Sequence, residues 1–277
     1  MSVELSPIIA GVMNWGVWDK NLNTNEFTHL INLFIENGIT TFDHADIYGG
    51  YTTEASFGKA LSESKIDRKK IQLITKCGIQ YVSENRPNNS IKHYEYSKDY
   101  IIWSAENSLK NLQTDYLDVF LLHRPSPLMQ ADEIAEAVSK LKADGKILSF
   151  GVSNFTSSQT ELLRQKTEIS FNQVQFSATH HEAMLDGSLD YMQIHNIKPM
   201  AWNPLGTVFR VETPFYFLRI HQFFYFFYFN WNVFHQIKSR SRILNDQIIF
   251  YSHPETFCRK INSRLYSKHH IFHKFIF

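Results

Sequence analysis

The chain has 277 residues, of which 43% are hydrophobic, so it is long enough to bury the core of one α/β domain. Its formal net charge of +1 gives no reason to expect nucleic acid or an anionic membrane as a partner, and we expect a small or neutral ligand. The two cysteines form neither a disulfide framework nor a metal-ligand spacing, so we expect a reduced, cytoplasmic protein without a bound metal.

From the start of the chain to about residue 210, short apolar runs alternate with longer amphipathic stretches, as in βα units on a parallel sheet. Residues 8–16 predict a strand, and no basic segment leading into a long apolar run precedes them, so we expect no secretory signal. Residues 25–37 place apolar side chains on one helical face, and Gly38 ends that helix. The strand at 39–43 follows directly.

The same alternation continues along the chain. Further helices are predicted at 53–62, 97–113, 131–145, 157–166 and 185–194. Further strands are predicted at 71–76, 116–123, 147–154, 171–177 and 198–206. Seven strands of this kind predict a (β/α)8 barrel of the TIM type that is incomplete, because no eighth βα unit can be read.

Polar or aromatic side chains stand at the ends of these strands, where parallel α/β sheets carry their chemistry. They are Asp43, Lys76, His123, Ser153, Asn154, Gln173 and Trp202. Tyr48 follows the second strand in a glycine-rich loop. A free phenol has a pKa of about 10 and is a poor acid at neutral pH, but a nearby ammonium lowers that pKa.

Lys76 is the candidate source of the ammonium charge, and Asp43 would hold Lys76 in place. His123 would orient a carbonyl oxygen towards the phenol of Tyr48. Together the four residues predict a device that protonates an alkoxide as it forms. Taken singly they have ordinary alternatives: a turn residue, a packed aromatic, a surface charge and a strand-end histidine. Their joint occurrence at successive strand ends favours the catalytic interpretation.

The remaining strand ends suit a nicotinamide. Ser153, Asn154 and Gln173 are candidates for hydrogen bonds to a carboxamide, and Trp202 offers a flat face for a ring to stack on. The alternative for Ser153 and Asn154 is capping of the helix that follows. The sequence contains no P-loop and no GxGxxG fingerprint, but a barrel can hold a nucleotide through its loops instead.

Six motifs resemble, in order and spacing, the aldo-keto reductases, most closely the bacterial YdhF-like branch: FDHADIYGGY, ITKCG, LLHRP, GVSNF, NQVQ and MAWNPLG. The resemblance covers about residues 8–210. It implies a monomer that reduces aldehydes or ketones with NADP(H), or alternatively NAD(H), in which Tyr48 is the general acid. It assigns Asp43, Tyr48, Lys76 and His123 to the catalytic tetrad. It assigns cofactor contacts to Asn14, Ser153, Asn154, Gln173, Trp202, Asn203, Leu205 and Gly206. Trp15 falls on the substrate pocket.

The chain departs from this family after about residue 210, and we divide it into a barrel domain at 1–210 and a divergent tail at 211–277. The tail contains no glycine and no alanine, a run dense in phenylalanine and tyrosine at 215–234, and nine Lys and Arg against three Asp and Glu. We interpret it as out-of-frame translation of AT-rich DNA. The alternatives are an interfacial or aggregation-prone segment and, least favoured, a membrane span.

No counterpart of the family's eighth strand, or of the phosphate-binding loop after it, is readable in the tail. Seven strands would leave two open edges, and the segment QIIFY at 247–251 is the candidate for filling the gap. Two other functions therefore stay open: a nucleotide-binding regulatory module without turnover, and an inactive truncated reductase.

Overall fold

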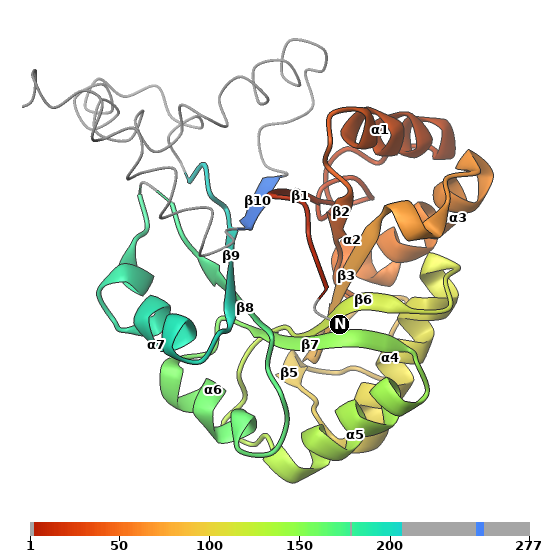
Figure 1. The fold of residues 1–277 in the computed structure, drawn as a ribbon. Coiled ribbons are helices and arrows are strands. Elements are labelled where there is room, and N and C mark those ends of the chain that lie inside the picture. The colour runs from red at the N-terminus through yellow and green to blue at the C-terminus, as the bar shows by residue number, and fades with distance from the viewer. Residues whose placement is uncertain (1–2, 178, 207–247, 252–277) are drawn as a thin grey trace, which may run out of the picture.

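The computed structural model describes residues 3–177, 179–206 and 248–251. Seven described strands run parallel around a barrel of the TIM type, which confirms the predicted fold class (Figure 1). They are β1 (Ile8–Gly11), β2 (Thr41–Asp43), β3 (Gln72–Cys77), β6 (Leu117–Leu122), β7 (Ile147–Ser153), β8 (Phe171–Gln175) and β9 (Lys198–Trp202). Each predicted strand up to residue 206 corresponds to one of them.

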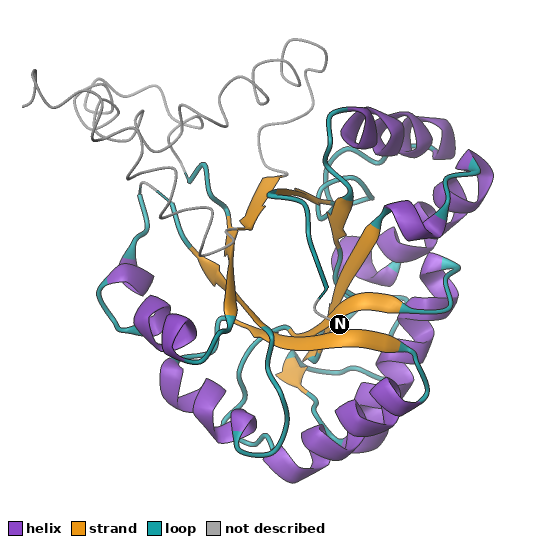
Figure 2. Ribbon diagram, viewed as in Figure 1, coloured by secondary structure: helices purple, strands orange, loops and turns teal. Residues whose placement is uncertain are grey.

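The described helices lie around the outside of the barrel (Figure 2). They are α1 (Thr24–Glu36), α2 (Tyr48–Tyr51), α3 (Thr53–Ser64), α4 (Lys98–Leu112), α5 (Ala131–Ala143), α6 (Ser157–Arg164) and α7 (Ser188–Ile194), with 3-10 turns η1 (Arg68–Lys70) and η2 (Glu182–Met184). Between β3 and α4 the chain forms a small antiparallel hairpin of β4 (Ile79–Gln80) and β5 (His93–Tyr94), which the sequence did not predict.

The gap left by the seven parallel strands is filled by β10 (Ile248–Tyr251), which lies within the QIIFY segment. It pairs antiparallel with both β1 and β9 and closes the barrel. The eighth position is therefore occupied by a strand of reversed direction. The boundary predicted at residue 210 and the aromatic run at 215–234 lie outside the described residues. Within the described ranges no helix has the length and apolarity needed to cross a bilayer.

Local sequence signals account for where the helices begin. Asn23 caps α1 in a capping box with Glu26, whose carboxylate accepts a hydrogen bond from the Asn23 backbone N–H. Thr156 caps α6 in the same way, in partnership with Gln159. Because Thr156 is the N-cap, the strand-end residues before it are not needed to cap this helix and are available for another role.

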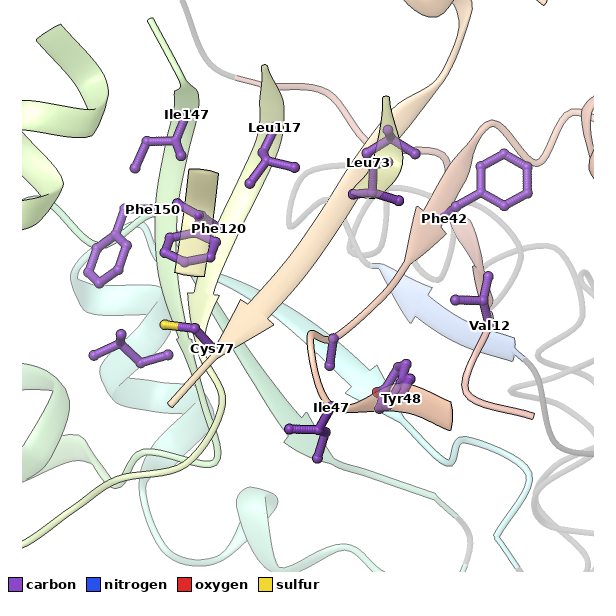
Figure 3. Close-up of a cluster of buried hydrophobic side chains, with 14 of the residues drawn as sticks. Val12, Phe42, Ile47, Tyr48, Leu73, Cys77, Leu117, Phe120, Ile147 and Phe150 are labelled. Carbon is purple, nitrogen blue, oxygen red and sulfur yellow. The ribbon is translucent and has the colours of Figure 1, made fainter. Parts of the chain in front are cut away.

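Alternate residues on each strand face opposite sides, and the two sides have separate cores. The larger core lies between the barrel and the helices, and its members include Phe42, Leu73, Phe120 and Phe150 (Figure 3). The smaller core fills the barrel itself and consists of Leu5, Ile9, Ile74, Val119, Leu121, Phe171 and Met200. This inner core supports the side chains at the carboxyl ends of the strands.

Candidate active site

The interior of the barrel changes from apolar to polar at its carboxyl end. Lys76 shares a face with Ile74 of the inner core, and Gln173 shares one with Phe171, because each pair is two residues apart on a strand. The strand-end residues predicted to meet there are Asp43, Lys76, His123, Ser153, Gln173 and Trp202. The parallel registers place neighbouring strand ends side by side, so these residues lie at one end of the barrel.

Lys76 is the centre of the group. Its Nζ donates to Asp43 Oδ2 at 2.7 Å, to the His44 carbonyl oxygen at 2.7 Å and to the Tyr48 hydroxyl oxygen at 3.3 Å. The side chain is 0% exposed. An ammonium has three N–H donors, and these three acceptors account for all of them. A single lysine thus joins the ends of two strands to the tyrosine of the following loop.

The electrostatics of this group keep Lys76 charged. Burial by itself lowers the pKa of Lys76, but the attraction of Asp43 and Tyr48 outweighs it, and the pKa lies above its ordinary value. For Tyr48, burial raises the pKa and is only partly offset by the Lys76 ammonium. The expectation that Lys76 brings the Tyr48 pKa below its ordinary value is therefore wrong, because desolvation of the buried phenol is the larger effect.

The glycine pair after Tyr48 is explained by the backbone. Gly49 and Gly50 have φ of 60° and 66°, in the left-handed region that favours glycine, and Tyr51 follows at 71°. A Cβ atom on Gly49 would lie 2.4 Å from Thr53 Oγ1. The chain therefore turns sharply enough after Tyr48 to start α3 immediately, and Tyr48 stays at the strand ends.

His123 faces Tyr48 across the site. The two ring centroids are 6.1 Å apart with an interplanar angle of 79°. The His123 backbone N–H donates to the Cys77 carbonyl, and its Nδ1 is buried without a hydrogen-bond partner among the described residues. Burial, followed by the charges of Lys76 and Arg124, lowers the pKa of His123 well below its ordinary value. The imidazole is therefore neutral and carries one N–H donor.

A second chain of hydrogen bonds extends from Asp43 to the far strand ends. Gln173 Nε2 donates to Asp43 Oδ1 at 3.1 Å, and the Ser153 hydroxyl donates to the Gln173 carbonyl at 3.1 Å. Asn154 Nδ2 donates to Ser153 Oγ at 2.8 Å, and Trp202 Nε1 donates to Asn154 Oδ1 at 2.8 Å. All four residues predicted to hold a nicotinamide are thus joined to Asp43.

The structure adds Arg124, which the sequence analysis did not single out. Its guanidinium carbon lies 5.5 Å from the centroid of the Trp202 ring. The sequence did contain a signal for Arg124, because this residue directly follows His123 at the end of a predicted strand. A basic group thus lies against the proposed ring-stacking surface, and its charge also acts on Tyr48.

The other predicted cofactor residues lie in the loops above the strands. Asn14 is half-buried in the loop after β1, and Leu205 is half-buried after β9. Gly206 donates its N–H to the Asn203 carbonyl at 2.9 Å, and both residues have positive φ. A Cβ on Gly206 would lie 2.3 Å from Thr179 Oγ1. No hydrogen bond among the described residues joins these four residues to the Lys76 group.

Trp15 does not line the site as predicted. It is 0% exposed and lies 5.6 Å from Phe27 and 5.8 Å from Phe34, measured between ring centroids, with Phe42 and Phe57 also in contact. These rings belong to the core between the barrel and helices α1 and α3. Burying the large indole ring in that layer is more favourable than leaving it exposed at the site.

Trp18 is the tryptophan of this loop that reaches the site. Its ring centroid lies 6.1 Å from that of Tyr48 and 6.3 Å from that of Tyr81, and 45% of the residue is exposed. The sequence contained one signal for it, since Trp18 is followed by charged and amide residues whereas Trp15 is not. Trp18 therefore replaces Trp15 as the aromatic wall beside the proposed proton donor.

A buried carboxyl group, Asp46, lies two residues before Tyr48. Its Oδ2 accepts hydrogen bonds from Tyr100 at 3.2 Å and from Ser104 at 3.3 Å, and its Oδ1 has no partner among the described residues. Burial and, second, the charge of Glu54 raise the pKa of Asp46 to about 8. The folded protein therefore holds a proton on Asp46 at neutral pH.

This proton makes the stability depend on pH. Between the ordinary Asp pKa of 3.8 and about 8, the folded chain binds a proton at Asp46 that the unfolded chain releases, so stability falls as pH rises through this range. We expect Asp46→Asn to reduce the drop in Tm between pH 5 and pH 8. The exposed Asp115→Asn is the control, and an unchanged drop in Asp46→Asn would contradict the assignment.

Comparisons with known proteins place this geometry in a family context. The family profile described as "Aldo/keto reductase family" matches residues 7–213. The chain is 46% identical over 215 residues to an uncharacterized oxidoreductase, YcsN, of Bacillus subtilis, covering 76% of this chain and 71% of the relative. It is 44% identical over 205 residues to the oxidoreductase YdhF of Escherichia coli, covering 73% of this chain and 67% of the relative.

Solved structures give the same picture of the fold. An aldo-keto reductase from Bacillus halodurans in its holo form superposes with a TM-score of 0.65 at 26% identity, covering 76% of this chain and 66% of that chain. A glycerol dehydrogenase from Gluconobacter oxydans gives a TM-score of 0.62 at 27% identity, covering 70% of this chain and 58% of that chain. The match to this chain spans less than two thirds of each of these two structures.

Proposed function

The chain belongs to the aldo/keto reductase family, and from that premise we propose that it reduces an aldehyde or ketone to an alcohol with NADPH and with Tyr48 as the general acid. The observation that carries the proposal is the contact of one buried ammonium, Lys76, with both Asp43 and Tyr48 at the carboxyl end of the barrel. Family membership alone supports an oxidoreductase of carbonyl compounds. The geometry supports the roles of the individual residues.

The residues at the strand ends fit a nicotinamide. Gln173 is 3% exposed and uses its Nε2 on Asp43, which leaves its Oε1 as the acceptor that it offers to a carboxamide. Asn154 Nδ2 uses one N–H on Ser153 and retains a second donor. Trp202 is half-buried beside them. When bound, the reduced nicotinamide supplies the hydride that attacks the carbonyl carbon.

The protein's own part in the reaction is the delivery of a proton. The Tyr48 hydroxyl gives its proton to the carbonyl oxygen as that oxygen gains charge, and the Lys76 ammonium stabilises the phenolate left behind. The neutral His123 donates a hydrogen bond to the same oxygen and directs it towards Tyr48. Asp43 keeps Lys76 charged and in place. Trp18 and Tyr81 favour a substrate with an apolar part next to its carbonyl group.

We propose NADPH rather than NADH as the cofactor. The proposed substrate is a small carbonyl compound, and we propose that the protein is a monomer in the cytoplasm. The reversed direction of β10 favours one competing interpretation, an inactive truncated reductase that lacks the phosphate-binding loop of the family. In a barrel of this kind, each parallel strand supplies the site with the loop that follows its carboxyl end. β10 runs in the opposite direction, so its amino end faces the site and it cannot supply such a loop. Binding and turnover therefore have to be measured separately.

A nucleotide titration tests the first half of the proposal. We expect NADPH to quench tryptophan fluorescence saturably, because Trp202 stands beside the proposed ring site. Gln173→Leu removes the carboxamide acceptor and is expected to weaken binding by about three- to tenfold, the worth of one neutral hydrogen bond. The same substitution at the exposed Gln193 is the control. Equal binding by both variants, or no binding by folded protein, would contradict the proposed site.

A further inference from the structure

An open cavity lined by polar and aromatic side chains lies outside the candidate active site. It has a volume of about 400 Å³ and is bounded by the β4–β5 hairpin segment and α4. Its lining includes Gln80, Arg86, Asn88, Asn89, Tyr100 and Trp103, and none of these is a candidate active-site residue. A cavity of this size holds a small metabolite rather than a single water or ion.

Arg86 is held rigidly in the wall of this cavity. Its guanidinium carbon lies 4.5 Å from the centroid of the Tyr51 ring and 4.6 Å from that of the Trp103 ring. A guanidinium stacked against two aromatic rings loses much of its conformational freedom before any ligand arrives. These two contacts restrict where the guanidinium can lie.

The charge of Arg86 acts on the buried carboxyl groups of Asp46 and Glu54, but neither forms an ion pair with it. No described carboxylate lies within ion-pair distance of it, and its Nε is buried without a hydrogen-bond partner. Leaving donors of a half-buried guanidinium unpaired is unfavourable, so a group that accepts hydrogen bonds in the plane of the guanidinium would be stabilised there.

Amide groups line the cavity next to Arg86. Gln80 is 4% exposed, and its Oε1 accepts from Asn89 Nδ2 at 2.8 Å, while its Nε2 has no partner among the described residues. Asn89 Nδ2 also donates to the Tyr81 carbonyl at 3.2 Å. Because Gln80 Nε2 is itself buried, the exposed Asn88 amide is the one that offers a donor and an acceptor to hydroxyl groups on a ligand.

The segment that carries these residues is anchored to the barrel. Asn85 Nδ2 donates to the Gly50 carbonyl at 2.8 Å, and the Ser83 hydroxyl donates to the same oxygen at 3.4 Å. Gly50 belongs to the tight turn that follows Tyr48. The wall is thus fixed by hydrogen bonds at one end and by the amide pair of Gln80 and Asn89 at the other, as expected of a preorganised site.

We propose that this cavity is a binding site for a small hydroxylated carboxylic acid, with the carboxylate paired in the plane of the Arg86 guanidinium and the hydroxyl groups bonded to the amides. Glu95 at the cavity wall supplies a negative charge against the single guanidinium, so a monoanion fits better than a phosphate dianion. The site is separate from the Lys76 group, so its existence does not depend on the proposed reaction.

The test is an NMR titration of the ¹⁵N-labelled full chain with gluconate, a six-carbon hydroxylated carboxylate. We expect saturable shifts of the Arg86 Nε–H and Trp103 indole signals, and none with sorbitol, its uncharged counterpart. Arg86→Gln is expected to weaken gluconate binding by about tenfold or more, the worth of a charge-assisted bidentate pair. Lys92→Gln removes a positive charge from the same hairpin at an exposed position and is expected to have no effect.

Three results would overturn the proposal. Equal shifts with sorbitol would show that the carboxylate is not recognised. Tighter binding of inorganic phosphate than of gluconate would make the cavity an anion site of another class. Unchanged affinity in Arg86→Gln would place the ligand elsewhere. Because loss of the stacked guanidinium also weakens packing, the exposed Asn88→Ala is a second variant, expected to weaken gluconate binding while Tm stays unchanged.

Discussion

Tyr48→Phe is expected to lower the rate of carbonyl reduction by about 100- to 10,000-fold, the usual contribution of a positioned general acid. The substitution removes one oxygen atom and leaves the aromatic ring, so the ring contact with Trp18 and the turn at Gly49 remain. The proton that neutralises the forming alkoxide then has to come from water. Single-turnover kinetics with NADPH and an aromatic aldehyde measure the effect on the chemical step.

Nucleotide affinity should be unchanged in this variant, because Tyr48 takes no part in the hydrogen-bond chain from Asp43 to Trp202. The control is Tyr94→Phe, which makes the same chemical change at a residue that is 41% exposed on β5. A Tyr48→Phe enzyme that retains its full rate would remove Tyr48 as the acid. A chain that binds NADPH without measurable turnover before mutation would favour the regulatory alternative instead.

Lys76→Met is expected to have the largest effect on stability. It leaves the Asp43 carboxylate, which is 1% exposed, without its ionic partner in the barrel interior. Breaking one side of a buried pair typically destabilises a protein by about 3–5 kcal/mol, because the remaining charge stays desolvated. Denaturation by urea, followed by circular dichroism, measures the change in the free energy of unfolding.

The exposed pair of Lys98 and Glu136 provides a matched control. Its N–O distance is also 2.7 Å, but the two side chains are 42% and 61% exposed. Lys98→Met should therefore change stability little. The double variant Asp43→Asn with Lys76→Met removes both charges and should recover part of the loss. A double variant no more stable than Lys76→Met would show that the unpaired carboxylate is not the cause.

The parts of the site that could be predicted from the sequence are those fixed by strand order. Asp43 and Lys76 stand at the ends of apolar runs, and the parallel strands of a barrel bring such ends together. Gln173 lies within β8, after Phe171 and Asn172. The sequence predicted the contact of Asp43 with Lys76, but it did not predict the hydrogen bond from Gln173 to Asp43. Trp15 and Trp18 are different, because both lie in one loop and have the same chemistry. Which of them is buried depends on how α1 and α3 pack, and periodicity does not determine that.

Two other features required information that is not local. The Tyr48 pKa depends on the balance between desolvation and the Lys76 charge, and only the folded structure gives the degree of burial. The apolar run at 247–251 identified a candidate strand, but the pairing of β10 with β1 and β9 sets its register and reversed direction. Whether the inserted strand runs parallel or antiparallel depends on the two strands that border the gap rather than on the inserted sequence.

Because all three N–H groups of the Lys76 ammonium are hydrogen-bonded, this residue can also report when the barrel opens. Acylating and alkylating reagents attack only a neutral, accessible amine, and Lys76 is charged, enclosed and bonded through all three hydrogens. Surface amines would react first, while Lys76 becomes available only when the strand ends separate. The extent of Lys76 labelling, read by peptide mass spectrometry against time, would therefore follow the rate at which the folded barrel opens.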